Sequence, residues 1–172
     1  MELGLLVLRV VVGALFVGHG AQKLFGAFGG HGVSGTAGFF DSIGLRPGRL
    51  HAVAAGSAEL GGGVLLALGL VTPLAALLLT AVMTAAILTV HLRNGVWVTA
   101  NGYEYNLVLI AAAFALAAVG AGEWSLDNAL GLDVAGTGWA LAALGLGLVG
   151  GAGAAFSSRF QRAEGRSAQP TA

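Results

Sequence analysis

The chain contains no cysteine. Disulfide bonds, thiolate nucleophiles and Cys-bound zinc or iron–sulfur clusters are therefore excluded as chemistry that the chain supplies by itself. Charged side chains are also scarce: they make up 9% of the 172 residues, whereas 56% are hydrophobic and the mean hydropathy is +0.85. Soluble domains carry about 25% charged residues. This composition indicates a protein that lies in a lipid bilayer.

Long apolar runs define the expected fold. A membrane-spanning helix needs about 20 mostly apolar residues, and we expect such helices at about 3–24, 50–70, 73–92, 104–121 and 138–156. The first run lacks the basic start and cleavage site of a signal peptide, so we expect it to be retained. The second and third form a tight hairpin, with Pro73 in the first turn of a helix. The prediction is an all-α membrane helical bundle with a four-helix core and a fifth, glycine-rich transmembrane helix.

Two segments outside these runs complete the predicted organisation. In the first loop, Ser34 or Thr36 offers an N-cap, apolar residues follow at helical spacing, and Gly44 offers a stop. This pattern predicts a short interfacial helix on the inner membrane surface; the alternative is a disordered loop. Residues 1–157 thus form one transmembrane domain, and residues 158–172 are expected to form a basic, disordered cytoplasmic tail.

The basic residues predict the orientation. If all five segments cross the bilayer, seven of the eight basic residues fall on one side, and the eighth, Arg9, lies inside the first segment. The seven are Lys23, Arg46, Arg49, Arg93, Arg159, Arg162 and Arg166. The opposite side receives "GEWSLDNALGLD", which has no Lys or Arg. Because basic loops stay in the cytoplasm, we expect a multi-pass plasma-membrane protein with its N-terminus outside and its C-terminus in the cytoplasm.

Arg9 and Glu59 are charged residues in the interior of two predicted spans. A charge at this depth costs a few kcal/mol unless it has a partner. With the first two helices antiparallel, the two residues lie within about 6 Å of the same depth, so we expect them to pair. Such a pair fits either a polar pocket or an ion pair that only fixes the packing.

Further polar residues gather at the cytoplasmic ends of the spans. His19 and Lys23 lie on the only polar face of the first helix, within an arc of about 80° that also holds Arg9. His91 ends the third span and Glu104 begins the fourth, on the same side of the membrane.

This cluster has two interpretations. With His51 nearby, it suits a small anion or a quinone head group, with a histidine as proton donor. The other interpretation is an interfacial belt, in which Trp97, Tyr103 and Tyr105 anchor the helices and the histidines are hydrated. We expect a pocket of His19, Lys23, His91 and Glu104, with no metal bound.

The order of motifs resembles the DoxX family of small membrane proteins. The matching stretches are "LRVVVGALFVGHGAQKLFG", "GTAGFFDSIGL", "SAELGGGVLLALGLVTPLAA", "AAILTVHLRNG", "NGYEYN" and "WSLD", which span about residues 5–127. The resemblance implies a four-helix membrane core, which the glycine-rich fifth segment extends. The positions that match the family pattern are Arg9, His19, Lys23, Glu59, His91 and Glu104.

The resemblance also implies a functional setting. Members of the family are associated with thiosulfate:quinone oxidoreductase or terminal quinol oxidase assemblies and, in mycobacteria, with a membrane complex that contains superoxide dismutase and a sulfurtransferase. By resemblance the chain is a membrane subunit of a redox or sulfur-metabolising system that binds a quinone or a small anion. The alternative is a non-catalytic scaffold that recruits soluble partners through its basic inner face. A second copy of the chain is a further partner left open, whereas no nucleic acid is expected.

Overall fold

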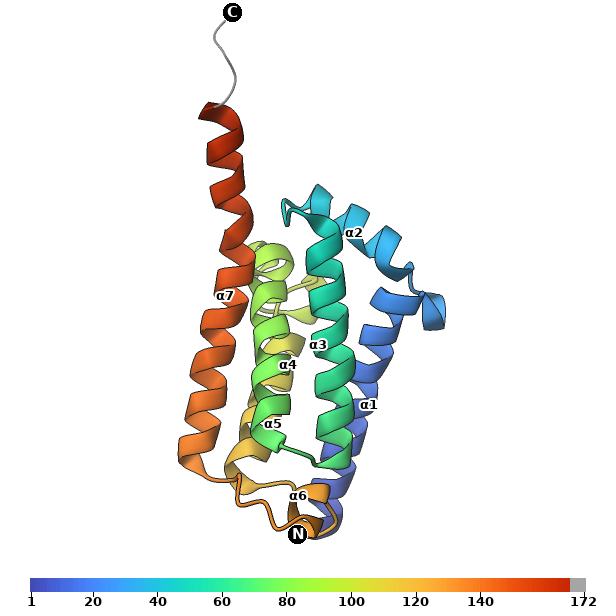
Figure 1. The fold of residues 1–172 in the computed structure, drawn as a ribbon, viewed down its shortest axis with the longest axis vertical. Coiled ribbons are helices and arrows are strands. Elements are labelled where there is room, and N and C mark those ends of the chain that lie inside the picture. Colours follow the sequence, from blue (N-terminus) through green and yellow to red (C-terminus); the bar gives the residue numbers. More distant parts are fainter. Residues whose placement is uncertain (168–172) are drawn as a thin grey trace, which may run out of the picture.

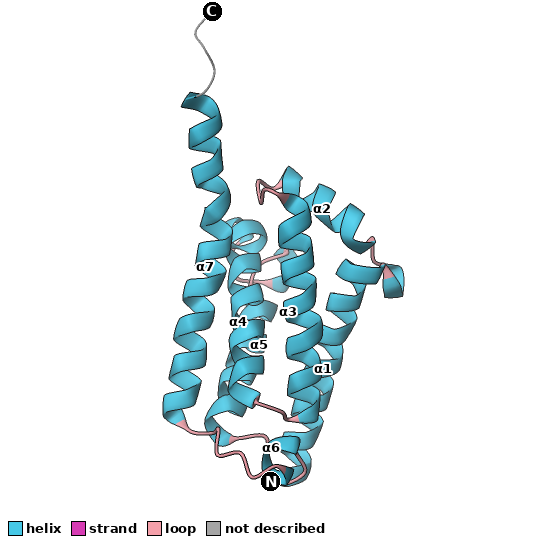
Figure 2. Ribbon diagram, in the orientation of Figure 1, coloured by secondary structure: helices cyan, strands magenta, loops and turns pink. Residues whose placement is uncertain are grey.

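The long helices run between two ends of the molecule in the computed structural model, which describes residues 1–167 and their side chains as far as Ser157 (Figure 1). These helices are α1 (Glu2–Phe25), α3 (Gly48–Leu68), α4 (Thr72–Ala86), α5 (Glu104–Val119) and α7 (Thr137–Ser167). The shorter ones are η1 (Ala27–Gly29), α2 (Gly32–Ser42), η4 (Val98–Ala100) and α6 (Leu126–Ala129). The helix α4 continues into a π-helical turn, η2 (Ile87–His91), and a 3-10 turn, η3 (Leu92–Asn94). Among the described residues there is no strand (Figure 2).

The helices confirm the prediction of an all-α membrane bundle. Four are long and apolar enough to cross a bilayer: residues 2–25, 48–68, 72–94 and 137–157. The fifth, α5, is apolar but has only 16 residues, which span about 24 Å against the roughly 30 Å of a typical hydrocarbon core. The glycine-rich span that the sequence predicts is the helix α7. With four helices of this length and hydropathy, the chain is a multi-pass membrane protein.

Glycines set the closest helix contact, between α1 and α3. A Cβ atom built on Gly13 would lie 2.6 Å from the carbonyl oxygen of Gly63, and one on Gly20 would lie 2.7 Å from that of Gly56. Both pairs are seven residues apart, so they lie on one face of each helix. The backbones can approach this closely only because neither helix has a side chain at these positions.

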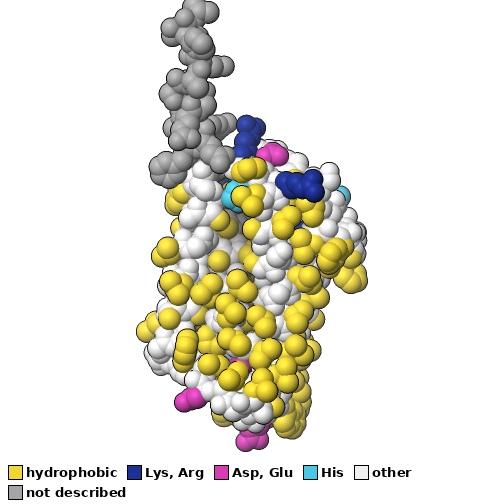
Figure 3. Space-filling view, viewed as in Figure 1, with side chains coloured by type: hydrophobic (Ala, Val, Ile, Leu, Met, Phe, Trp, Pro, Cys, Tyr) yellow, Lys and Arg dark blue, Asp and Glu magenta, His cyan; other side chains and the backbone are white. Residues whose placement is uncertain are grey.

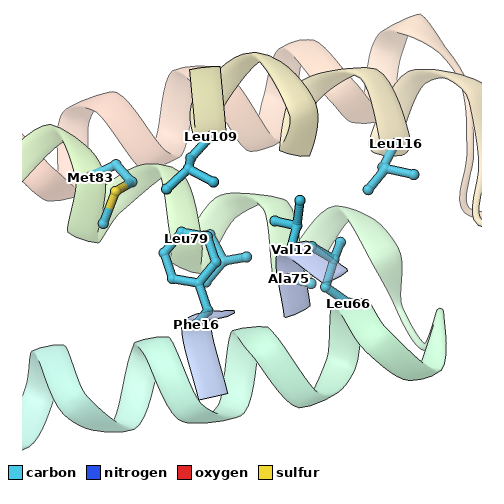
Figure 4. Close-up of a cluster of buried hydrophobic side chains, with 8 residues drawn as sticks. All are labelled: Val12, Phe16, Leu66, Ala75, Leu79, Met83, Leu109 and Leu116. Atoms are coloured by element: carbon cyan, nitrogen blue, oxygen red, sulfur yellow. The ribbon is translucent and has the colours of Figure 1, made fainter. Parts of the chain in front are cut away.

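The core fills the remaining space between the helices. Val12 and Phe16 of α1 pack against Leu66, Leu79 and neighbouring side chains of α3, α4 and α5 (Figure 4). The helix α7 packs outside this core, where Gly147 and Gly151 let it lie against Thr80 and Thr84 of α4. In consequence α3 and α7 flank α4 on either side (Figure 1).

The connections agree with the sequence in outline and differ in detail. The α3–α4 hairpin is confirmed, with Pro73 in the first turn of α4. A helix is present in the first loop, as predicted, but it begins at Gly32 with His31 as N-cap residue, so the predicted caps Ser34 and Thr36 lie inside it. It begins earlier because Gly32 itself has a positive φ of 64°, which turns the chain into the helix without a side-chain cap.

The C-terminal end of α7 and the exposed Lys and Arg side chains lie at the end of the molecule opposite the N-terminus (Figures 1 and 3). The helix α7 continues to Ser167, although the sequence predicts a disordered tail from residue 158. Residues 159–164 ("RFQRAE") include good helix formers and no proline, so the helix can continue through them. Residues 168–172 lie outside the described part. On the face shown in Figure 3, the Lys and Arg side chains lie at the end that carries α2, and acidic side chains lie at both ends.

Candidate functional site

A cavity of about 560 Å³ lies at the end of the bundle that carries α2. Side chains from α1, α2, α3, α4, α5 and α7 line it, and most of them are apolar. Three of the four histidines of the chain line this cavity, namely His19, His51 and His91, together with Lys23 and Glu59. The structure therefore brings together polar residues of two separate helices, α1 and α3, and one helical turn, η2, as the sequence led us to expect for His19, Lys23 and His91.

Lys23 and Glu59 form an ion pair in this cavity. The ammonium group of Lys23 lies 2.8 Å from Oε1 and 2.6 Å from Oε2 of Glu59. The Glu59 side chain is 3% exposed and that of Lys23 is 24% exposed. Because both carboxylate oxygens face the same ammonium group, the pair neutralises its own charges within the cavity wall.

A hydrogen bond to a neighbouring amide fixes the position of the proton on His19. The Nδ1 atom of His19 lies 3.2 Å from Oε1 of Gln22, whose amide nitrogen donates to the carbonyl of Phe28. An amide oxygen only accepts, so Nδ1 carries the hydrogen. In the neutral ring, Nε2 is then the nitrogen with a lone pair, as a proton acceptor requires.

His91 has the same arrangement at the π-helical turn. Its Nδ1 atom lies 2.9 Å from the backbone oxygen of Asn101, which can only accept a hydrogen bond. Nε2 of the neutral ring therefore keeps its lone pair, as in His19. The five residues of η2 widen the end of α4, and π-helical turns of this kind often occur at functional sites. The sequence gave us no reason to expect this turn.

Two residues that sequence reasoning left aside complete the polar part of the cavity. Asn106 is buried on α5 and its amide nitrogen lies 3.2 Å from Sδ of Met83. Tyr105 precedes it in the chain and also lines the cavity. Both belong to the "NGYEYN" motif, so the signal was present, but we interpreted Tyr105 as an interfacial anchor.

Glu104 does not line the cavity. Its carboxylate accepts a hydrogen bond of 2.9 Å from the backbone N–H of Val98 and so holds the turn η4 against the start of α5. The proposed role of Glu104 beside a histidine therefore has no support from the geometry, although its neighbour in sequence, Tyr105, does line the cavity.

The predicted pair of Arg9 and Glu59 is wrong. Arg9 is buried at the opposite end of α1, where its Nη2 atom donates to the backbone oxygen of Trp124 and Gly69 packs against its guanidinium group. The glycine contacts shift α3 by about 9 Å, between one and two helical turns, relative to the predicted alignment. The position on α1 that lies at the same height as Glu59 is therefore close to His19. Arg9 lies about 15 Å from that position along the axis of α1.

Asp127 is the acidic residue near Arg9, and the two interact electrostatically. Its carboxylate also accepts hydrogen bonds from the backbone N–H groups of Val71 and Thr72 and from the Thr72 hydroxyl. It therefore caps the start of α4 and ties the loop after α5 to the α3–α4 hairpin. The "WSLD" motif contained this residue, but only the fold shows its role, which is structural.

The arrangement as a whole suits a neutral ligand that has both polar and apolar parts. It offers two histidine acceptors, an ammonium group with a third N–H, and walls of Ala, Val, Leu, Met and Phe. Within residues 1–157, no group of three or more His, Asp or Glu side chains is arranged to hold a metal ion. A volume of this size lies within the range of small-molecule sites, about 300–1,000 Å³.

Comparisons with known proteins give a family model and a relative that match the chain. A family model described as DoxX matches residues 4–92, which include the three histidines of the cavity and both members of its ion pair. The chain is also 36% identical over 126 residues to a Bacillus subtilis (strain 168) protein named "Putative oxidoreductase CatD", across 73% of this chain and 86% of that protein. No solved structure gives a significant match.

Proposed function

The chain belongs to the DoxX family, and from this premise we propose that it is the quinone-binding membrane subunit of a redox system. The quinone head group lies in the cavity beside His19, His51 and His91. The single observation that carries the proposal is the gathering of three histidines around a neutralised ion pair inside a mostly apolar cavity. The name of the Bacillus relative, an oxidoreductase, supports the redox assignment.

The ion pair favours a quinone over a small anion. An anion needs an uncompensated positive charge, but the ammonium group of Lys23 already faces both oxygens of Glu59. A quinone head group needs only hydrogen-bond partners and apolar walls. The third N–H of Lys23 and the hydroxyl of Tyr105 suit its carbonyl oxygens. The Nε2 atoms of His19 and His91 suit the hydroxyl groups of the reduced, quinol form.

The histidines also suit proton exchange with the ligand. A neutral imidazole accepts a proton at the nitrogen that carries its lone pair and can return it afterwards, so Nε2 of His19 or His91 is placed to exchange a proton with a bound quinol. The electrons exchanged with the quinone belong to a partner protein, which we place at the basic end of the molecule. A redox or sulfur-metabolising enzyme is the partner that the family resemblance implies.

Equilibrium binding of tailless quinones tests the proposal. The purified protein in lipid nanodiscs should bind menadione or the tailless ubiquinone head group. The variants His19→Asn and His91→Asn keep a donor at the place of Nδ1 but remove Nε2. Each should weaken binding of the reduced probes, menadiol and the tailless ubiquinol, about tenfold, because only a quinol hydroxyl group donates to Nε2 and one lost hydrogen bond is worth about 1.4 kcal/mol.

The fourth histidine supplies the matched control. His31 is exposed at the start of α2 and does not line the cavity. His31→Asn should therefore bind the same probes as the parent protein does. If the parent binds neither probe, or if all three variants bind as the parent does, the proposal is wrong and the scaffold that recruits soluble partners becomes the better interpretation.

A further inference from the structure

The cavity reaches the side of the bundle between α3 and α7. Ala54 of α3 and Gly150 of α7 both line the cavity, and both are exposed at the molecular surface. Ala81 and Ala85 of α4 lie between them and are partly exposed. Since α3 and α7 pack on either side of α4 (Figure 1), these residues form the rim and floor of a lateral opening. Small side chains keep it open.

This opening lies at the depth of the lipid chains. Ala54 is six residues from the start of α3, and Gly150 is seven residues from Ser157, so each lies about 10 Å inside the basic end of the bundle. The residues beside the rim, Val53 and Val149, are 42% and 71% exposed. Apolar side chains with this exposure are expected to face hydrocarbon in a membrane protein.

The end of the cavity that faces water is covered instead. The helix α2 places Phe39 and Phe40 in the cavity lining, and the following loop adds the buried side chain of Leu45. The segment after η3 adds Val98 and Asn101. Two separate segments therefore close the end of the bundle over the histidines, while the side between α3 and α7 has only alanine and glycine at its rim.

We propose that the ligand is a quinone with a polyprenyl tail, which enters from the bilayer between α3 and α7 and keeps its tail in that opening. This inference rests on the proposed function and adds the class of quinone. A polyprenyl chain is narrow and apolar, as the opening is, and it lies in the bilayer before the head group binds. The head group then reaches His19 and His91 without crossing the covered end.

The variant Gly150→Phe tests the position of the tail. An added Cβ at Gly150 would have one neighbour, Cβ of Ala81 at 3.8 Å, so a side chain can begin there without a clash, and a ring attached to it would lie at the opening. In nanodiscs the variant should bind a polyprenyl-tailed menaquinone or ubiquinone at least about tenfold more weakly than the parent, since the buried tail loses contact with the protein. Binding of the tailless head groups should change by less than about twofold.

Gly145→Phe is the matched control. Gly145 lies on the same helix, is exposed, has no neighbour within 4 Å of an added Cβ and does not line the cavity. It faces about 140° away from Gly150. This variant should bind both classes of quinone as the parent does. On α3, Ala54→Phe with Val53→Phe as its control repeats the comparison and guards against a folding defect in α7.

The outcomes separate this inference from the proposed function. Selective loss of the tailed quinone in Gly150→Phe or Ala54→Phe supports both. If the parent binds tailless quinones and the rim variants bind tailed quinones as the parent does, or lose both classes equally, the lateral opening is not the site of the tail and the proposed function stands. If the parent binds no quinone, both are overturned.

Discussion

Among single residues, the buried ionisable groups form two sets at opposite ends of the bundle. Lys23 and Glu59 pair inside the cavity, near α2. Arg9 and Asp127 lie near the N-terminus, where the carboxylate caps α4 and the guanidinium group binds a backbone oxygen. A buried charge is tolerated in a membrane only with such partners. The first set lines a site, whereas the second holds the loops of one end together.

The pair in the cavity can be tested with a double-mutant cycle. Lys23→Met should lower the free energy of unfolding by about 3 kcal/mol, because it leaves the buried carboxylate of Glu59 without a partner, and Glu59→Gln should lower it by less, because Lys23 is partly exposed. The double variant should lose clearly less than the sum of the two. Thermal unfolding of the purified variants in one detergent measures this coupling.

Arg9 provides the control for that cycle. Since Arg9 lies about 15 Å from the level of Glu59 along α1, Arg9→Met and Glu59→Gln should add within about 0.5 kcal/mol when combined. Coupling between Arg9 and Glu59, together with additivity between Lys23 and Glu59, would contradict the pairing seen in the structure.

The sequence was sufficient to find most of these residues but not their partners. A charge inside an apolar run stands out, so Arg9, Lys23 and Glu59 were identified as residues that need an explanation. Which charge meets which depends on the register between α1 and α3, and that register is decided by backbone contacts of glycines such as Gly13 and Gly20. Helical periodicity gives the face of a residue but not its height against the neighbouring helix.

Among the elements, the α1–α3 contact is therefore the one that positions the cavity. Gly20→Ala places a methyl group 2.5 Å from the backbone nitrogen of Leu60, and Gly13→Ala places one 2.6 Å from the oxygen of Gly63. Backbone atoms cannot move aside as a side chain can, so each change should lower the free energy of unfolding by about 1–3 kcal/mol. Thermal unfolding in detergent measures the loss.

Gly18 on the same helix gives the comparison. A Cβ atom at Gly18 would have no neighbour within 4 Å, and alanine is a better helix former than glycine. Gly18→Ala should therefore leave stability unchanged or raise it by up to about 1 kcal/mol. Equal losses at Gly18 and Gly20 would show that glycine is needed for some reason other than close packing.

Other elements were predictable to different degrees. The spans and the hairpin at Pro73 follow from hydropathy and from the lack of an N–H on proline, which are local properties. The π-helical turn that holds His91 has no local pattern of this kind. It depends on the contacts of the following segment, in which Asn101 accepts the hydrogen bond of His91. The sequence did not predict that α7 forms part of the cavity wall, because Gly150 has no side chain that would mark it as a lining residue.

For the whole molecule, the two ends differ in chemistry. The end with α2 carries the cavity, the histidines and the exposed basic side chains (Figure 3). The other end carries the N-terminus and α6 (Figure 1). A quinone site near the basic end would place proton exchange on the cytoplasmic side if basic residues face the cytoplasm, as they usually do. The orientation thus decides from which compartment the site takes its protons.

Reporter fusions measure that orientation. The C-terminal end of α7 lies at the basic end of the bundle, opposite the N-terminus (Figure 1), so a green fluorescent protein fused after Ala172 should be fluorescent, which requires the cytoplasm, and alkaline phosphatase fused there should be inactive. The same reporters inserted after Leu132, in the acidic loop between α6 and α7, should give the reverse pattern. The loop insertion makes the result independent of expression level, because both reporters are compared at both sites. Active phosphatase after Ala172 with fluorescence from the loop would show that the bundle is inverted and that the basic end faces outward, so that the proposed quinone site would lie near the outer compartment.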